Sequence, residues 1–218
     1  GRPRKYFGQY CQYSSRYSLA LESLAQNKPT QVPNTFLAEF ANGALIDIGI
    51  YPLYPVMALW GEPKSVSAQG VMLATGVDGA GDIILDYGDK VASISFSKIC
   101  NGENFVEFQG ELGRLRVEFV SLMRKVELFL NDGHYELLSA DNTINNKDEN
   151  DQPMRYEISH FIELVQTHQA LAQSGKTASN GELQSKVTSW QLSQQVINVI
   201  DQARKQIGVV YPNDDVHN

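Results

Sequence analysis

The pattern of apolar and polar positions divides the chain into regions of different character. Residues 44–60 form an almost continuous apolar stretch that is closed by Gly61. This length and this glycine stop predict a buried helix. Pro55 lies inside the stretch and predicts a kink or a new turn, because proline removes a helical N–H group. Before the helix, tyrosines alternate with polar residues over residues 5–17, which predicts a strand with one wet face and then a loop.

Over residues 64–139 the pattern changes, and in several segments apolar and polar residues alternate with the period of two that is typical of a β-strand. Residues 92–97 read Ala-Ser-Ile-Ser-Phe-Ser, so one face of the predicted sheet is apolar and must be covered. The glycine-rich run 76–81 and the Asn-Asp-Gly run 131–133 predict turns, and such short connections favour mainly antiparallel pairing. The predicted strands are residues 66–75, 82–87, 91–99, 105–109, 114–119, 125–130 and 134–138.

Two helices are predicted at the end of the chain, after a polar loop at residues 141–152. The first covers about residues 154–174, where apolar residues recur on one side, and the second covers about residues 181–206. The order of the elements predicts a single α+β domain over residues 1–218. Its open, mainly antiparallel β-sheet should have helices packed on one face.

Composition fits this picture and excludes some classes of protein. The 218 residues are 42% hydrophobic and 20% charged, which is ordinary for a soluble globular chain with a proper core. The net charge of −7 argues against a nucleic-acid partner, because phosphate binding needs a concentrated basic surface. Residues 1–20 are locally basic, through Arg2, Arg4, Lys5 and Arg16. A solvated strand edge is a better explanation of these charges than a binding patch.

The cysteines and the ends of the chain bear on its location. Cys11 and Cys100 are too few and too far apart for a disulfide framework, which indicates buried thiols in a reducing compartment. We find no apolar run near the roughly 20 residues that span a bilayer, and no signal-peptide core at the N-terminus. We therefore expect a cytoplasmic protein with no membrane partner. The chain lacks an initiator methionine, which suggests a fragment or a processed product.

The sequence shows no motif for a metal or a cofactor. None of the four histidines has a Cys, His or carboxylate partner at a recognised ligand spacing. The glycines of residues 76–81 have the wrong spacing for a dinucleotide loop and lie between two predicted strands. We find neither a phosphate-binding loop nor a nucleophile elbow. We therefore expect no metal and no cofactor on this chain alone.

Asp47 and Tyr51 are the strongest candidates for chemistry. They are four positions apart in the apolar stretch, so a helix would project both from one face. A tyrosine whose environment favours the phenolate can donate or accept a proton, and a nearby carboxylate can orient a substrate hydroxyl or a lysine. The competing interpretation is a buried hydrogen-bonded pair that only holds the helix in place. Spacing alone leaves both open.

The neighbourhood of this pair resembles a known family. Residues 44–55 read Ala-Leu-Ile-Asp-Ile-Gly-Ile-Tyr-Pro-Leu-Tyr-Pro, and Leu-Trp-Gly-Glu-Pro-Lys-Ser-Val follows at 59–66. This run resembles the first helix of the C-terminal domain of the Gfo/Idh/MocA oxidoreductases, the family of glucose–fructose oxidoreductase and inositol dehydrogenase. Glu157 with Phe161, residues 196–204 and residues 208–212 look like the last two helices and the tail of that domain.

The resemblance implies a function and a missing half. In the family, a nucleotide-binding Rossmann domain comes first, and a glyceraldehyde-3-phosphate-dehydrogenase-like C-terminal domain follows. Asp47 matches the family's catalytic aspartate, and Tyr51 matches its proton donor, as in glucose–fructose oxidoreductase and the dihydrodiol dehydrogenases. The third catalytic residue is a lysine in a Glu-Lys-Pro motif of the Rossmann domain, and this sequence has none. The chain thus resembles an excised second domain, inactive alone, of an enzyme that uses NAD or NADP.

Three further residues are weaker candidates for substrate binding. Arg16 ends the first predicted strand and could bind a substrate hydroxyl or carboxylate, although a surface salt bridge is equally good. Tyr54 could line the same pocket or pack against Trp60, and His168 is a core or cleft histidine.

The expected partners are a small molecule, namely a sugar, polyol or cyclic diol, and a second copy of the chain. An exposed apolar sheet face would serve a homodimer or tetramer. The rival hypothesis is a non-catalytic oligomerisation or ligand-binding module.

Overall fold

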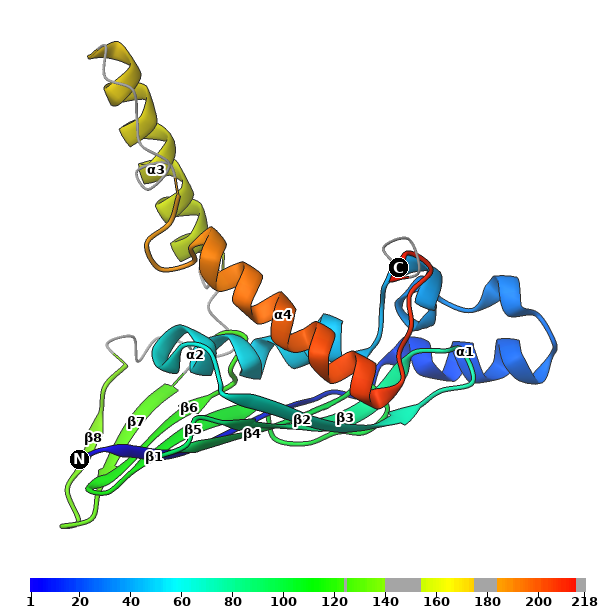
Figure 1. Cartoon of the computed structure of the whole chain (residues 1–218), viewed down its shortest axis with the longest axis horizontal. Helices are drawn as coiled ribbons and strands as arrows, with labels where there is room; N and C mark the ends of the chain where they lie inside the picture. Colours follow the sequence, from blue (N-terminus) through cyan, green and yellow to red (C-terminus); the bar gives the residue numbers. More distant parts are fainter. Residues whose placement is uncertain (124, 140–153, 175–183, 215–218) are drawn as a thin grey trace, which may run out of the picture.

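The computed structural model describes residues 1–123, 125–139, 154–174 and 184–214. It confirms the predicted fold class, because these residues form an eight-stranded, mainly antiparallel sheet with helices on one face (Figure 1). The strands are β1 (Pro3–Cys11), β2 (Ser65–Met72), β3 (Asp78–Asp86), β4 (Val91–Ser97), β5 (Phe105–Gly110), β6 (Gly113–Glu118), β7 (Lys125–Leu130) and β8 (Tyr135–Leu137). The α-helices are α1 (Ser15–Ala25), α2 (Ile50–Trp60), α3 (Arg155–Gln173) and α4 (Trp190–Ile207). Shorter segments are 3₁₀ turns at Pro29–Gln31, Asn34–Phe36 and Ala38–Phe40, and a π-helix at Leu45–Gly49.

The first strand lies in the middle of the sheet. The strand order is β2-β3-β4-β1-β5-β6-β7-β8, and β1 pairs in parallel with β4 while the other neighbouring strands are antiparallel. The register places Cys11 beside Ser97, and Ser97 beside Ala80 of β3. The ends of β1 and β4 and the start of β3 therefore meet at one end of the sheet. The N-terminus of α1 lies at the same end, since Ser14 N donates to Lys98 O.

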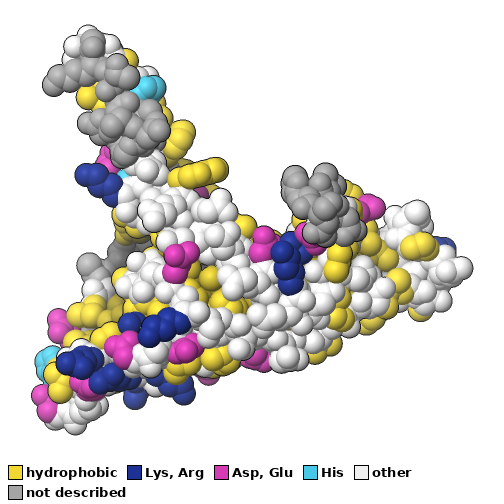
Figure 2. Space-filling view, in the orientation of Figure 1, with side chains coloured by type: hydrophobic (Ala, Val, Ile, Leu, Met, Phe, Trp, Pro, Cys, Tyr) yellow, Lys and Arg dark blue, Asp and Glu magenta, His cyan; other side chains and the backbone are white. Residues whose placement is uncertain are grey.

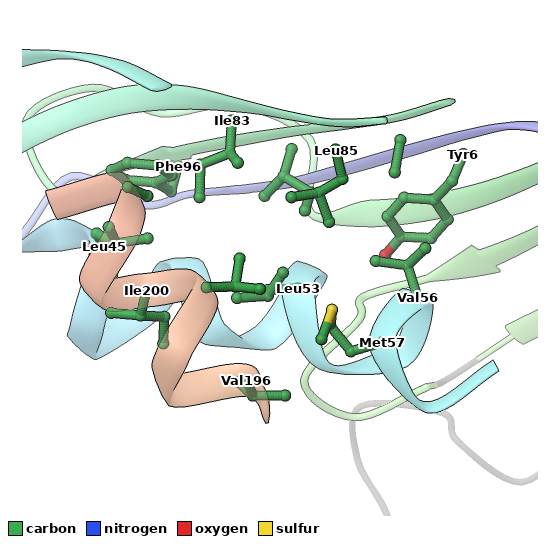
Figure 3. Close-up of a cluster of buried hydrophobic side chains, with 14 of the residues drawn as sticks. Tyr6, Leu45, Leu53, Val56, Met57, Ile83, Leu85, Phe96, Val196 and Ile200 are labelled. Carbon is green, nitrogen blue, oxygen red and sulfur yellow. The ribbon is translucent and has the colours of Figure 1, made fainter. Parts of the chain in front are cut away.

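The apolar sheet face predicted from the period of two is covered by α2 and α4. Ala92, Ile94 and Phe96 of β4 are each at most 1% exposed. Figure 3 shows Leu53 of α2 and Ile200 of α4 between these helices and the sheet. Because burial of a large apolar side chain stabilises a fold by about 1.5–3 kcal/mol, this layer holds the helices on the sheet.

The predicted helix over residues 44–60 is present, but it begins as a π-helix and continues as α2. The segment Ala38–Trp60 is long and apolar enough to cross a membrane by length and composition alone. This corrects the expectation that no apolar run approaches that length. The segment buries Leu45, Val56 and Met57 against the sheet, and it is therefore the core helix of the domain (Figure 3).

The chain before this helix differs from the prediction. The strand predicted over residues 5–17 ends at Cys11, and α1 follows it. The alternating tyrosines hid this change, although Ser14 is a helix-start signal: its Oγ accepts a hydrogen bond from Arg16 N at 3.3 Å. A smaller correction concerns β3, which begins at Asp78 rather than at residue 82, so only the first part of the glycine-rich run is a turn.

The predicted helix over residues 154–174 is confirmed as α3, but its apolar side is not buried. Ile158 is 52% exposed and Phe161 is 66% exposed. Figure 1 shows the reason: α3 projects away from the sheet, whereas α4 lies along it. The second predicted helix, over residues 181–206, is present as α4, but it begins at Trp190, and residues 184–189 are not helical. The predicted loop at residues 141–152 and the predicted helix residues 181–183 lie outside the described residues.

The sheet face opposite the helices is not the apolar surface that was expected for dimerisation. Phe7 and Phe105 contact each other there with ring centres 5.5 Å apart. Arg116 lies over the Phe105 ring at 4.1 Å, and Arg114 lies over the Phe129 ring at 4.4 Å. Charged side chains of both signs gather at the end of the molecule formed by β5–β8 (Figure 2). This open face therefore mixes aromatic rings with ion pairs.

The C-terminal tail is clamped onto the segment that precedes the π-helix. The buried guanidinium of Arg204 donates to both carboxylate oxygens of Asp214, at 2.6 and 2.8 Å, and its hydrogen bonds lower the pKa of Asp214 to about 2. The Arg204 guanidinium also lies 4.6 Å from the Tyr211 ring. The hydroxyl of Tyr211 donates to Asn42 O at 3.2 Å. The tail thereby fixes the chain entry into the π-helix.

We expect Leu53→Ala to lower the free energy of unfolding by about 2–5 kcal/mol, because the side chain is fully buried between α2 and the sheet. The matched control is Leu59→Ala on the same helix, where Leu59 is 68% exposed and the change should stay within about 0.5 kcal/mol. Urea unfolding of the chain measures both. Equal effects of the two substitutions would contradict this packing.

Candidate active site

Three segments meet around a cavity at the end of the sheet where β1 and β4 finish. They are the connection from β1 into α1, the π-helix, and the residue that follows β4. The cavity has a volume of about 400 Å³ and is lined by Gln12, Tyr13, Ser14, Ser15, Arg16, Asp47, Ile48 and Lys98. Most of these side chains are polar, so the cavity suits a ligand rich in hydroxyl groups.

The π-helix is anchored to the sheet by a buried carboxylate. Asp78 at the start of β3 is 1% exposed, and its Oδ2 accepts a hydrogen bond from Leu45 N at 2.7 Å. Burial raises the pKa of Asp78, while the backbone N–H groups of Leu45 and Ala44 and the charge of Lys98 act in the opposite direction. Gly43 permits this approach, because a Cβ there would lie only 2.2 Å from Asp78 Oδ1. The N–H groups at the start of the helix thus have an acceptor in the core.

Asp47 pairs with a buried lysine. Its Oδ2 lies 2.6 Å from Lys98 Nζ, and the two side chains differ greatly in exposure, at 46% for Asp47 and 5% for Lys98. The ammonium group also donates to Thr35, through the hydroxyl and through the carbonyl oxygen. Asp47 is thus held from the protein side and open to the cavity on the other.

Tyr51 lies one turn further along the same helical run and is 43% exposed. Its ring stacks on Tyr10, with ring centres 5.1 Å apart. The hydroxyl of Tyr10 donates to Gln12 Oε1 at 3.4 Å, and Gln12 lines the cavity that contains Asp47. The stack therefore places Tyr51 against Tyr10, whose hydroxyl contacts the cavity-lining Gln12, and leaves Tyr51 partly open to solvent. The interpretation of Asp47 and Tyr51 as a buried pair does not apply.

The weaker candidates are placed differently. Arg16 lies in the first turn of α1 and lines the cavity with Asp47. Tyr54 lies on α2, is half-buried against the core and does not line that cavity. His168 is exposed on α3, which projects away from the sheet, so the expectation of a core or cleft histidine is not met (Figure 1). The structure thus brings Arg16 together with Asp47, but not His168.

Lys98 is the site residue that the sequence interpretation missed. A signal was present, because the period of two puts Lys98 on the same face as Ala92, Ile94 and Phe96, which is the buried face. A lysine in that position needs a charged or polar partner. The strand prediction ran through residue 99, but no one-dimensional pattern could identify Asp47 as the partner.

Among the described residues, no group of three or more His, Cys, Asp or Glu side chains could hold a metal ion. The site instead contains a carboxylate, a phenol and a guanidinium that line or adjoin a polar cavity. Such groups bind and orient hydroxyl groups and move protons.

The chain is thus an α+β domain with a helix-covered sheet, and Asp47 and Tyr51 are exposed on one helical run. The family described as the GFO/IDH/MocA C-terminal domain matches residues 7–116, which is half of the chain. The chain therefore belongs to the Gfo/Idh/MocA oxidoreductases, as the resemblance in sequence implied.

Named relatives agree with this membership. Scyllo-inositol 2-dehydrogenase (NADP(+)) IolU of Bacillus subtilis is 33% identical over 214 residues, which are 98% of this chain and 57% of the relative. The uncharacterized oxidoreductase YgjR of Escherichia coli is 35% identical, over 99% of this chain and 57% of the relative. Trans-1,2-dihydrobenzene-1,2-diol dehydrogenase of Xenopus laevis is 30% identical, over 83% of this chain and 52% of the relative. The chain thus spans just over half the length of these relatives.

Solved structures share the fold. The UDP-N-acetylglucosamine 3-dehydrogenase GnnA from Acidithiobacillus ferrooxidans superposes with a TM-score of 0.62 at 15% sequence identity. The match covers 95% of this chain and 54% of that protein. At this identity the likeness concerns the arrangement of sheet and helices.

We expect Asp78→Ala to lower the free energy of unfolding by about 1–3 kcal/mol, because it leaves the Leu45 N–H group buried without an acceptor. Asp78→Asn is the matched control: its amide oxygen can still accept this hydrogen bond, so the loss should be smaller. Urea unfolding at neutral pH compares the two variants. An Asp78→Ala protein as stable as the original would show that the carboxylate is not the anchor.

Proposed function

We propose that this chain is the substrate-binding domain of an NAD(P)-dependent oxidoreductase that acts on CH–OH groups of a sugar, polyol or cyclic diol. The observation that carries the proposal is the placement of Asp47 and Tyr51, both about half exposed, one turn apart on a helical run anchored in the core, with Asp47 lining a polar cavity. Family membership supports the reaction type. The nucleotide-binding domain would be a separate part of the intact enzyme, and this chain alone is expected to be inactive.

In this proposal, the residues of the chain handle the hydroxyl group of the substrate. A bound nicotinamide cofactor supplies the hydride-transfer chemistry at the carbinol carbon. Tyr51 removes the hydroxyl proton during oxidation and returns it during reduction, aided by the lysine of the nucleotide-binding domain. Asp47 accepts a hydrogen bond from a substrate hydroxyl, or orients that lysine. The exposed phenol and carboxylate leave room for both contacts.

The lining of the cavity supports a substrate with several hydroxyl groups. Gln12, Ser14 and Ser15 offer uncharged donors and acceptors, and Arg16 offers a planar set of donors. The names of two relatives, one for an inositol and one for a cyclic diol, support the same substrate class. We expect the enzyme to be cytoplasmic. Cys11 and Cys100 are both free thiols; Cys11 is buried as predicted, but Cys100 is exposed, which corrects the prediction of two buried thiols.

We expect Tyr51→Phe in the full-length enzyme to lower kcat by about 10²–10⁴-fold, because it removes the proton donor and acceptor but keeps the ring that stacks on Tyr10. Cofactor binding should be unchanged. Tyr135→Phe is the matched control, since Tyr135 lies on β8 and its hydroxyl contacts Glu127. Steady-state kinetics measures both, and a near-normal kcat of Tyr51→Phe would refute the role of this tyrosine.

We further propose that the open sheet face forms a homodimer or a larger homo-oligomer. Aromatic rings and arginines are enriched in protein interfaces, and this face presents Phe7, Phe105 and Phe129 with Arg114 and Arg116. An assembly module without catalysis would use the same face. The two hypotheses differ in one expectation: a module without catalysis should lose no function in the Tyr51→Phe variant.

We expect sedimentation velocity to show dimers or larger species of this chain, and Phe7→Glu to shift them to monomers, because it puts a charge in the centre of the open face. Leu112→Glu is the matched control, since Leu112 is a 62% exposed apolar residue in the β5–β6 turn. A monomer at all concentrations in the unaltered chain would count against this interface.

A further inference from the structure

Lys98 carries an ammonium group almost wholly inside the domain. Its side chain is 5% exposed, and Nζ lies 5.0 Å from the centre of the Phe36 ring. Its backbone is fixed on both sides: the N–H group donates to Gly79 O at 2.9 Å, and the carbonyl accepts from Ser14 N at 2.9 Å. Burial of an ammonium group is unfavourable unless the group is paired, so its partners indicate its role.

The three donors of this ammonium group are all used within the chain. They go to Asp47 Oδ2 at 2.6 Å, to the hydroxyl of Thr35, and to Thr35 O at 3.3 Å. A lysine ammonium has three N–H donors and no acceptor. Lys98 therefore has no donor left for a substrate, and any effect on the reaction must pass through Asp47.

The contacts of Asp47 are one-sided. Lys98 and the Thr35 hydroxyl both donate to Oδ2, and no hydrogen bond from the described residues reaches Oδ1. The side chain is 46% exposed and lines the cavity. Because Oδ2 is engaged by both donors, Oδ1 is the oxygen left to accept a hydrogen bond from a ligand in the cavity.

We propose that Lys98 is a positioning residue, which holds Asp47 Oδ2 so that Asp47 Oδ1 is directed at a hydroxyl group of the substrate. The inference rests on the function proposed above. It assigns the site a lysine within this domain, distinct from the lysine that the family resemblance places in the nucleotide-binding domain. Lys98 orients the carboxylate, whereas that other lysine is expected to assist the phenol.

A double-mutant cycle in the full-length enzyme tests this role. Lys98→Met keeps an unbranched apolar side chain and removes the charge, and Asp47→Asn removes the carboxylate. We expect Lys98→Met to lower kcat by about 10–100-fold, because a small displacement of a reacting group has effects of this size. KM should change by less than about threefold. In the Asp47→Asn background, Lys98→Met should have no further effect on kcat, because the group that it positions is gone.

Lys90→Met is the matched control. Lys90 immediately precedes β4 and Lys98 immediately follows it, and the Lys90 ammonium also lies near aromatic rings, at 5.5 Å from Trp60 and from Tyr87. It is remote from the cavity, so kcat should be unchanged. A general effect of losing a ring-packed lysine would appear in both variants.

The outcomes separate the two proposals. Normal kcat in Lys98→Met, or the same loss in the Asp47→Asn background, would overturn the positioning role and leave the proposed function standing. Normal kcat in Asp47→Asn itself would remove the proposed function of Asp47, and the positioning role with it. Thr35→Val covers the case in which Lys98→Met does not fold. This substitution removes one hydrogen-bond acceptor of Lys98. It should lower kcat in the enzyme that has Asp47, but not in the Asp47→Asn background. An unchanged kcat of Thr35→Val in the enzyme that has Asp47 would also overturn the positioning role.

Discussion

The candidate site depends on how the start of one helix is tied to the sheet. The N–H groups at the beginning of the π-helix lie in the core, where water cannot satisfy them, and Asp78 accepts the hydrogen bond from Leu45. Gly43 allows the carboxylate to come this close, and the clamp between Arg204 and Asp214 holds the tail whose Tyr211 contacts Asn42. These polar contacts add to the apolar packing of Leu45, and together they fix the start of the helical run at the end of the sheet.

This anchoring separates rigid groups from reactive ones. Asp78 and Lys98 are buried and hydrogen-bonded within the chain, whereas Asp47 and Tyr51 are about half exposed. Asp78 holds the backbone of the helix start and Lys98 holds one oxygen of Asp47, while Asp47 itself lines the cavity. Preorganisation of this kind is what proton transfer to a bound hydroxyl requires, because misplaced groups lose most of their effect.

The sequence predicted the fold well where a pattern is local, and less well where a contact is distant. The apolar run 44–60 and the alternation at 92–97 predicted the core helix and a buried sheet face, and both are present. α1 was missed because the tyrosine-rich composition with interleaved polar residues continues past Ser14, into the helix. The apolar side of α3 looked like a core face but is exposed. Lys98 could be predicted as buried from its register, but its contact with Asp47 spans 51 positions and needs the fold.

The most direct test of this account is a crystal structure of the full-length enzyme with its nicotinamide cofactor and a bound polyol. The account predicts a substrate hydroxyl oxygen within about 2.6–3.2 Å of the Tyr51 hydroxyl. It also predicts a hydrogen bond from a substrate hydroxyl to Asp47 Oδ1, with Lys98 still on Oδ2. A polyol bound away from both side chains, or a direct contact between Lys98 and the polyol in place of Asp47, would contradict the account.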